Sequence, residues 1–186
     1  MIEAAARFER VLLDTSVLVS FGQAGQLFQL VQYLGERGSV VLDVEVEVRR
    51  LAAGRFPDLK TLALLRWPPG GSIALPTHLL ADARDLQRTR SRPGAGPAEN
   101  RGEIATVLLA QHQGALAILD DRLGRDLARF RGLPYLTTPQ LAAEMVVAGA
   151  TDEELALRVF AAATSQPVGP QDVAEAVARA RTALGR

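Results

Sequence analysis

The sequence VLLDTS at residues 11–16 and the sequence ALAILDD at residues 115–121 decide the predicted fold. Each segment is a short apolar run that ends in aspartate: Asp14 in the first, and Asp120 and Asp121 in the second. Short apolar runs bounded by turn or cap residues are typical of buried parallel strands. We therefore predict a buried strand in each segment, followed directly by a polar turn and the start of a helix.

Further strands and helices alternate with these two segments along the chain. Short apolar runs predict strands at residues 39–42, 73–75 and 134–136. Helical spacing of apolar residues and helix-ending glycines predict a helix from Leu27 to before Gly38, and others at residues 43–53, 58–67, 78–88, 102–112, 123–131 and 139–148. Repeated alternation of this kind predicts an α/β fold with a mostly parallel sheet.

The C-terminal part of the sequence has a different pattern. It predicts two helices, at residues 151–164 and 171–184, and Thr151 with Glu154 resembles a capping box for the first of them. Val173, Ala176, Val177, Ala180 and Leu184 form an apolar stripe on the second, which we expect to pack on the domain or on a second copy of the chain. The predicted organisation is a domain at residues 1–150 and a helical extension at residues 151–186.

Composition excludes several classes of protein. The chain has 186 residues, with 21 Lys and Arg against 21 Asp and Glu, and it has no cysteine. Zero net charge argues against a basic nucleic-acid-binding tail, and disulfides and thiolate metal sites both require cysteine. No apolar run reaches the roughly 18 residues of a membrane span, and the charged N-terminal segment does not resemble a signal peptide. We therefore expect a cytoplasmic protein without a membrane partner.

Arginine dominates the basic residues, because Lys60 is the only lysine. This bias could reflect overall composition, or it could supply guanidinium groups that bind phosphates. Several arginines flank residues 89–98, a segment rich in proline and glycine that predicts a mobile surface loop. They include Arg88, Arg90, Arg92 and Arg101.

Carboxylates are predicted to gather at one edge of the sheet. Asp14, Asp120 and Asp121 follow two strands whose carboxyl ends share that edge, and Glu103 lies in the first turn of the helix between them. Glu45 or Glu47, after another strand, could complete the group. Like charges this close oppose folding unless a cation neutralises them, and oxygen ligands without cysteine favour Mg²⁺ or Mn²⁺.

Each acid also has a simpler explanation. Asp14 and Asp121 could cap the helices that follow them, and Glu103 could interact with a helix dipole. Glu45 or Glu47 could belong to a solvated helix face. Taken together, however, acids after both strands with Glu103 between them indicate a shared site.

Three segments together resemble the PIN-domain family of metal-dependent ribonucleases. They are VLLDTSVLVSF at residues 11–21, VLDVEVEVRRL at residues 41–51 and NRGEIATVLLAQHQGALAILDDRLGRDLARFRGL at residues 100–133. The resemblance covers residues 10–148. It implies a three-layer α/β/α fold, in which helices sandwich the parallel sheet.

The resemblance also implies particular site residues. Asp14, Glu47, Glu103 and Asp121 match the four acids of the family, with Glu45 as the alternative to Glu47 and Asp120 as the alternative to Asp121. Ser16 matches a position that often holds a Ser, Thr or Asn beside the metal. Asn100 stands where several relatives have an acid.

The implied function is endoribonuclease activity that depends on Mg²⁺ or Mn²⁺. Relatives of this size are frequently toxins paired with a small antitoxin protein, and many form homodimers. Arg88, Arg90, Arg92 and Arg101 would then contact RNA phosphates. The competing hypothesis is a non-catalytic PIN-like module that binds RNA or assembles with a partner.

Overall fold

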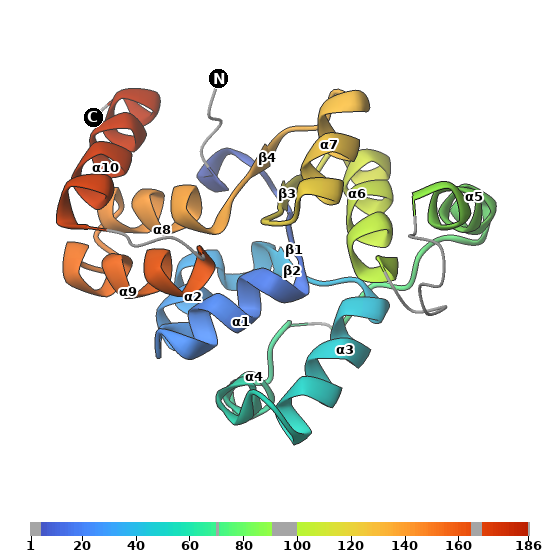
Figure 1. The fold of residues 1–186 in the computed structure, drawn as a ribbon, viewed down its shortest axis with the longest axis horizontal. Helices are drawn as coiled ribbons and strands as arrows, with labels where there is room; N and C mark the ends of the chain where they lie inside the picture. Colours follow the sequence, from blue (N-terminus) through green and yellow to red (C-terminus); the bar gives the residue numbers. More distant parts are fainter. Residues whose placement is uncertain (1–4, 70, 91–99, 165–168, 186) are drawn as a thin grey trace.

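A computed structural model describes residues 5–69, 71–90, 100–164 and 169–185. The chain folds as an α/β protein around a four-stranded parallel sheet with the strand order β2-β1-β3-β4 (Figure 1). The strands are β1 (Val11–Leu13), β2 (Gly38–Ser39), β3 (Leu116–Ile118) and β4 (Tyr135–Leu136). The prediction of an α/β fold with a parallel sheet is therefore confirmed.

The two central strands, β1 and β3, are fully buried. They pair in parallel, with Val11 opposite Leu116 and Leu13 opposite Ile118. Every residue of both strands is buried, as expected for parallel strands that are covered on both faces. This pairing brings the residues that follow β1 and β3 to the same edge of the sheet.

Helices make up most of the chain. The described α-helices are α1 (Thr15–Gln23), α2 (Leu27–Leu34), α3 (Leu42–Ala53), α4 (Lys60–Leu64), α5 (Leu80–Arg90), α6 (Arg101–Gln113), α7 (Arg122–Phe130), α8 (Thr138–Val147), α9 (Glu153–Ala163) and α10 (Pro170–Leu184). Short 3₁₀ helices span Ala5–Arg7, Gly35–Arg37, Pro57–Leu59 and Thr77–Leu79. None of the described helices has the length and apolar character needed to cross a bilayer.

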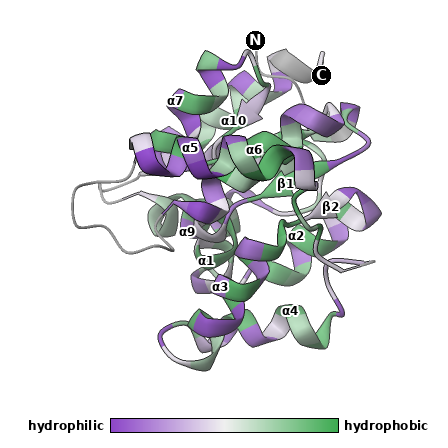
Figure 2. Ribbon diagram, turned by 90° about the vertical axis from the view of Figure 1, so that its right-hand side faces the viewer, coloured by the Kyte–Doolittle hydropathy of each residue, from purple (hydrophilic) through white to green (hydrophobic). Residues whose placement is uncertain are grey.

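The helices form two groups that flank the strands in Figure 1. In one group, α6 contacts β1 and β3, and α3, α5 and α7 pack against α6. In the other, α9 contacts α1 and α8, and α10 contacts α8 and α9. Figure 2 shows that α6 is largely hydrophobic, whereas α5 on its outer side is largely hydrophilic. This arrangement is consistent with three layers.

The apolar stripe of the last helix packs within the chain. Val173, Val177 and Ala180 are buried, and α10 contacts α8 and α9. The Leu184 side chain lies outside the described residues. Of the two expectations for this stripe, packing on the domain is the one that the structure shows.

Several predicted boundaries were wrong. The strand predicted at residues 39–42 is shorter, because Leu42 already begins α3, and residues 73–75 form only a single bridge between Ile73 and Val41. The helix predicted at residues 58–67 is a 3₁₀ turn followed by α4, which ends at Leu64. The next turn is broken at Arg66, whose φ of 51° is incompatible with a continuing helix.

Two further predictions, a helix cap and the start of a loop, also need correction. Asp152, not Thr151, caps α9, because its carboxylate accepts a hydrogen bond from the Leu155 amide at 2.8 Å. The Thr151 hydroxyl instead donates to the Gln26 side chain. The helix α5 continues to Arg90, and the rest of the loop predicted at residues 89–98 lies outside the described residues.

Candidate metal centre

The two aspartates that follow β1 and β3 occupy helix N-cap positions without capping the helices. Asp14 precedes α1 and Asp121 precedes α7, both in extended backbone conformation. Neither side chain makes a capping hydrogen bond. Capping is a common role of aspartate at this position, and neither carboxylate performs it here.

Three carboxylates converge at the end of the sheet. One oxygen from each of Asp14, Glu103 and Asp121 lies within 4.8 Å of the others. Glu103 reaches this point from the first turn of α6, whose packing on β1 and β3 holds it between the two strands. The structure thus brings together three of the four acids that the sequence resemblance implies.

The cluster is costly to fold when it carries full charge. Asp14 is 4% exposed, and burial raises its pKa to about 6. Burial and the neighbouring charge of Asp14 raise the pKa of Glu103 to about 9. The Glu103 Oε2 atom is buried and has no hydrogen-bond partner. A buried acceptor in this state lacks the partner that would compensate its desolvation.

Neighbouring hydroxyl groups orient the acids. The Ser16 hydroxyl donates to Asp14 Oδ2 at 3.0 Å, and the Thr15 hydroxyl donates to Glu47 Oε2 at 2.8 Å. Glu47 reaches the same cavity from α3. The cavity measures about 380 Å³ and is lined by Asp14, Thr15, Ser16, Glu47, Arg50, Asn100, Arg101, Gly102, Glu103 and Asp121.

Gly102 allows α3 and α6 to approach each other beside the cluster. A Cβ atom at this position would lie 3.1 Å from Val44 Cγ2 on α3, which is a tight contact. It would also lie 3.7 Å from Asp14 Oδ1 and 3.8 Å from Glu47 Oε2. A side chain here would therefore crowd Val44 on α3 and would lie in ordinary contact with the two acids.

The structure distinguishes between the alternative acids. Glu45 is bound by Arg49 and by the Ser72 hydroxyl, so Glu47 is the residue of α3 that reaches the cavity. The Asp120 carboxylate accepts hydrogen bonds from the Thr138 amide at 2.8 Å and from the Thr138 hydroxyl at 2.7 Å. Both of its oxygens are thereby used at the start of α8. The proposal of Asp120 as a metal ligand is not supported by this placement, whereas Asp121 lies in the cluster.

We predict that Asp120→Ala affects stability rather than metal binding. Loss of two partly buried hydrogen bonds to a carboxylate should lower the free energy of unfolding by about 2–4 kcal/mol. Urea denaturation measures this change, and titration with Mg²⁺ under folding conditions should show an affinity near that of the wild type. A large loss of Mg²⁺ affinity with unchanged stability would contradict the structural role.

The predicted RNA-binding arginines differ in position. Arg101 lines the cavity and pairs with Asp43 at 2.9 Å, whereas Arg88 is exposed on α5 and lies 3.8 Å from Asp85. The side chain of Arg90 and all of Arg92 lie outside the described residues. Arg50 was missed, although it lies one helical turn after Glu47, 3.9 Å from that carboxylate. The spacing of three residues between Glu47 and Arg50 places both on one face of a helix, and it could have identified Arg50 from the sequence.

Comparison with known proteins adds no relative. No protein-family model, no curated protein and no solved structure matches this chain.

Proposed function

We propose that this protein is an endoribonuclease that depends on Mg²⁺ or Mn²⁺. The observation that carries the proposal is the convergence of Asp14, Glu103 and Asp121, two of which occupy N-cap positions without capping. The PIN-like fold implied by the sequence resemblance belongs to the same proposal. A small antitoxin partner and a homodimer remain predictions of that resemblance.

The donor set fits a hard divalent cation. All three groups offer carboxylate oxygen, which Mg²⁺ and Mn²⁺ prefer. The buried Glu103 Oε2 without a hydrogen-bond partner supports the same conclusion, because a cation would compensate it. A bound cation would acidify a water molecule for attack on phosphorus and offset the charge that develops on the phosphate.

The remaining residues of the cavity position these groups. Ser16 fixes the orientation of the Asp14 carboxylate, and Thr15 holds one oxygen of Glu47. We assign Glu47 the role of orienting the attacking water, because its carboxylate lines the cavity but is not among the three that converge. Arg50 and Arg101 line the same cavity and would bind phosphate oxygens of the substrate.

The function is tested by incubating the purified protein with single-stranded and structured RNA. Cleavage should require Mg²⁺ or Mn²⁺ and should stop when EDTA is added. DNA of the same sequence in parallel reactions measures the preference for RNA. Binding of RNA without cleavage in any metal condition would refute the nuclease and favour a non-catalytic binding module.

Glu47 and Glu45 provide a matched pair of variants on α3. We expect Glu47→Gln to lower the cleavage rate roughly 10–100-fold, as is typical when a group that orients a metal site is lost. Glu45→Gln removes the same charge from a carboxylate that is engaged by Arg49 and Ser72, and should cleave at nearly the wild-type rate. Single-turnover kinetics at saturating Mg²⁺ measure both rates. Equal rates for the two variants would exclude this role for Glu47.

A further inference from the structure

The solvent-facing side of α7 carries a row of arginines that begins beside the metal centre. Arg122, Arg125, Asp126 and Arg129 recur at helical spacing and so share one face, which we name the α7 arginine face. The opposite side of the helix buries Leu127 and Ala128. Asp121, which contributes to the carboxylate cluster, directly precedes Arg122, so this face starts at the edge of the cavity.

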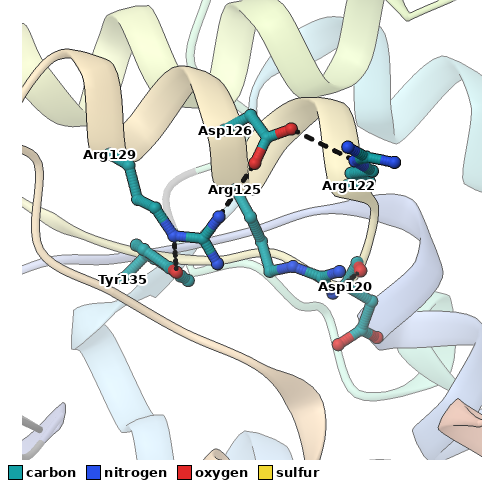
Figure 3. A network of polar contacts seen from close by, with 6 residues as sticks. All are labelled: Asp120, Arg122, Arg125, Asp126, Arg129 and Tyr135. Carbon is teal, nitrogen blue, oxygen red and sulfur yellow. Dashed lines mark hydrogen bonds and ion pairs between the residues drawn. The ribbon is translucent and has the colours of Figure 1, made fainter.

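The arginines are held in place by contacts within the protein (Figure 3). Arg122 and Arg129 both pair with Asp126, at 3.4 and 2.8 Å. Arg129 also donates to the Tyr135 hydroxyl at 3.0 Å, and its guanidinium lies over the Tyr135 ring. Arg125 binds the backbone carbonyl of Asp120. These contacts place the three guanidinium groups on the same side of the helix.

The α7 arginine face keeps an excess of positive charge. Asp126 is the one carboxylate among the four residues of this face, and it pairs with both Arg122 and Arg129, while Arg125 binds the backbone carbonyl of Asp120. The Arg122 side chain is 90% exposed and that of Arg129 is 61% exposed. A guanidinium has five N–H donors, so both retain donors that can bind phosphate.

Two exposed arginines of the C-terminal helices, Arg158 and Arg179, are arranged differently. On α9, Arg158 pairs with Glu154, and on α10, Arg179 pairs with Glu175. Each of these contacts joins one arginine to one glutamate, so the pair is neutral. The two arginines have exposures of 57% and 72%, comparable with those on α7. Figure 1 shows α9 and α10 across the strands from α6.

We propose that the α7 arginine face binds the phosphates of single-stranded RNA as it leaves the metal centre. The inference rests on the proposed nuclease function, because the cavity would hold the phosphate to be cleaved. Arg50 and Arg101 line that cavity from α3 and α6, and Arg122 begins the next group of cations along α7. The RNA thus passes from the cavity onto α7, where Arg122 and Arg129 contact successive phosphates.

The test measures RNA affinity against salt concentration in EDTA, so that no cleavage is needed. A labelled single-stranded RNA is titrated with the wild type, Arg122→Ser/Arg129→Ser, and the control Arg158→Ser/Arg179→Ser, which loses the same charge. Loss of two phosphate contacts should reduce the slope of log K against log salt by about 1.4. If the plots of the wild type and of the Arg122→Ser/Arg129→Ser variant meet at 1 M salt, this change of slope raises the Kd of the variant about 25-fold at 0.1 M salt. The control should keep the wild-type slope.

A second variant separates charge from local packing. Arg122→Lys/Arg129→Lys retains both positive charges, and its slope should lie close to that of the wild type. Equal slopes for the two serine double variants would overturn the proposal, and so would a lysine variant as weak as the serine variant. The nuclease proposal is judged separately by cleavage in Mg²⁺. If the wild type cleaves RNA but the α7 serine variant keeps the wild-type salt slope, only the proposed RNA contact with α7 is refuted. If the slopes are as expected but the wild type does not cleave RNA, only the nuclease proposal is refuted.

Discussion

Asp14→Asn and Asp121→Asn should each lower RNA cleavage by about 10³-fold at saturating Mg²⁺, because metal stabilisation of the transition state is worth several kcal/mol. Both side chains belong to the carboxylate cluster, and asparagine keeps their size while removing the charge that attracts the cation. Initial rates on a fluorogenic RNA, with each protein purified identically, measure the loss.

The control for this experiment is Asp58→Asn. Asp58 is an exposed aspartate before α4 that does not line the cavity, so its amide variant should cleave as the wild type does. If wild type and both cluster variants show the same residual cleavage, that cleavage comes from a contaminating nuclease and the proposal fails.

The stability of Asp14→Asn should change in the opposite direction to its activity. Burial raises the pKa of Asp14 from 3.8 to about 6, so its carboxyl group favours folding below pH 3.8 and loses that contribution as the pH rises through 6. At pH 8 the buried charge therefore costs about 3 kcal/mol, at 1.36 kcal/mol per pKa unit. The metal-free variant should be more stable than the metal-free wild type by an amount of this order.

Urea denaturation in EDTA, at pH 8 and at pH 4, measures this difference. The advantage of Asp14→Asn should be nearly absent at pH 4, where the wild-type carboxyl is largely protonated. Glu144, whose pKa burial raises to about 7, is present in both proteins and cancels from the comparison. Glu103 does not cancel, because the Asp14 charge helps to raise its pKa, and loss of that charge adds to the advantage of the variant at pH 8. Addition of Mg²⁺ at pH 8 should stabilise the wild type and not the variant. A variant less stable than the wild type in EDTA at pH 8 would show that Asp14 is a structural residue.

The sequence indicated the sheet and the acidic cluster because both depend on local patterns. The runs VLL and LAI are apolar and bounded by polar residues, and they are the strands β1 and β3. Since parallel strands end at one edge of the sheet, the positions of Asp14 and Asp121 followed from the strand assignment. The strand predicted at residues 39–42 runs past the end of β2 because Val40 and Val41 are as apolar as strand residues, although Leu42 already begins a helix.

Side-chain partners were beyond what local patterns could determine. Asp120 and Asp121 are adjacent in sequence, and only the position of Thr138 at the start of α8 shows which one is used for structure. The choice between Glu45 and Glu47 likewise depended on Ser72, a residue far along the chain. The α7 arginine face does not stand out in the sequence, because Arg122, Arg125 and Arg129 lie among Asp126 and apolar residues, as in any amphipathic helix.

Under the proposed function, the pairing of β1 with β3 also determines when the protein could become active during its synthesis. The central strand β1 is made well before its neighbour β3 and before Asp121, the last acid of the cluster in chain order. A nascent chain that ends before Asp121 has at most Asp14, Glu47 and Glu103, so it lacks a complete carboxylate cluster. On the proposed function, a chain built in this order would gain nuclease activity only after Asp121 has been made, and it would stay inactive until then beside the ribosomal RNA and its own message.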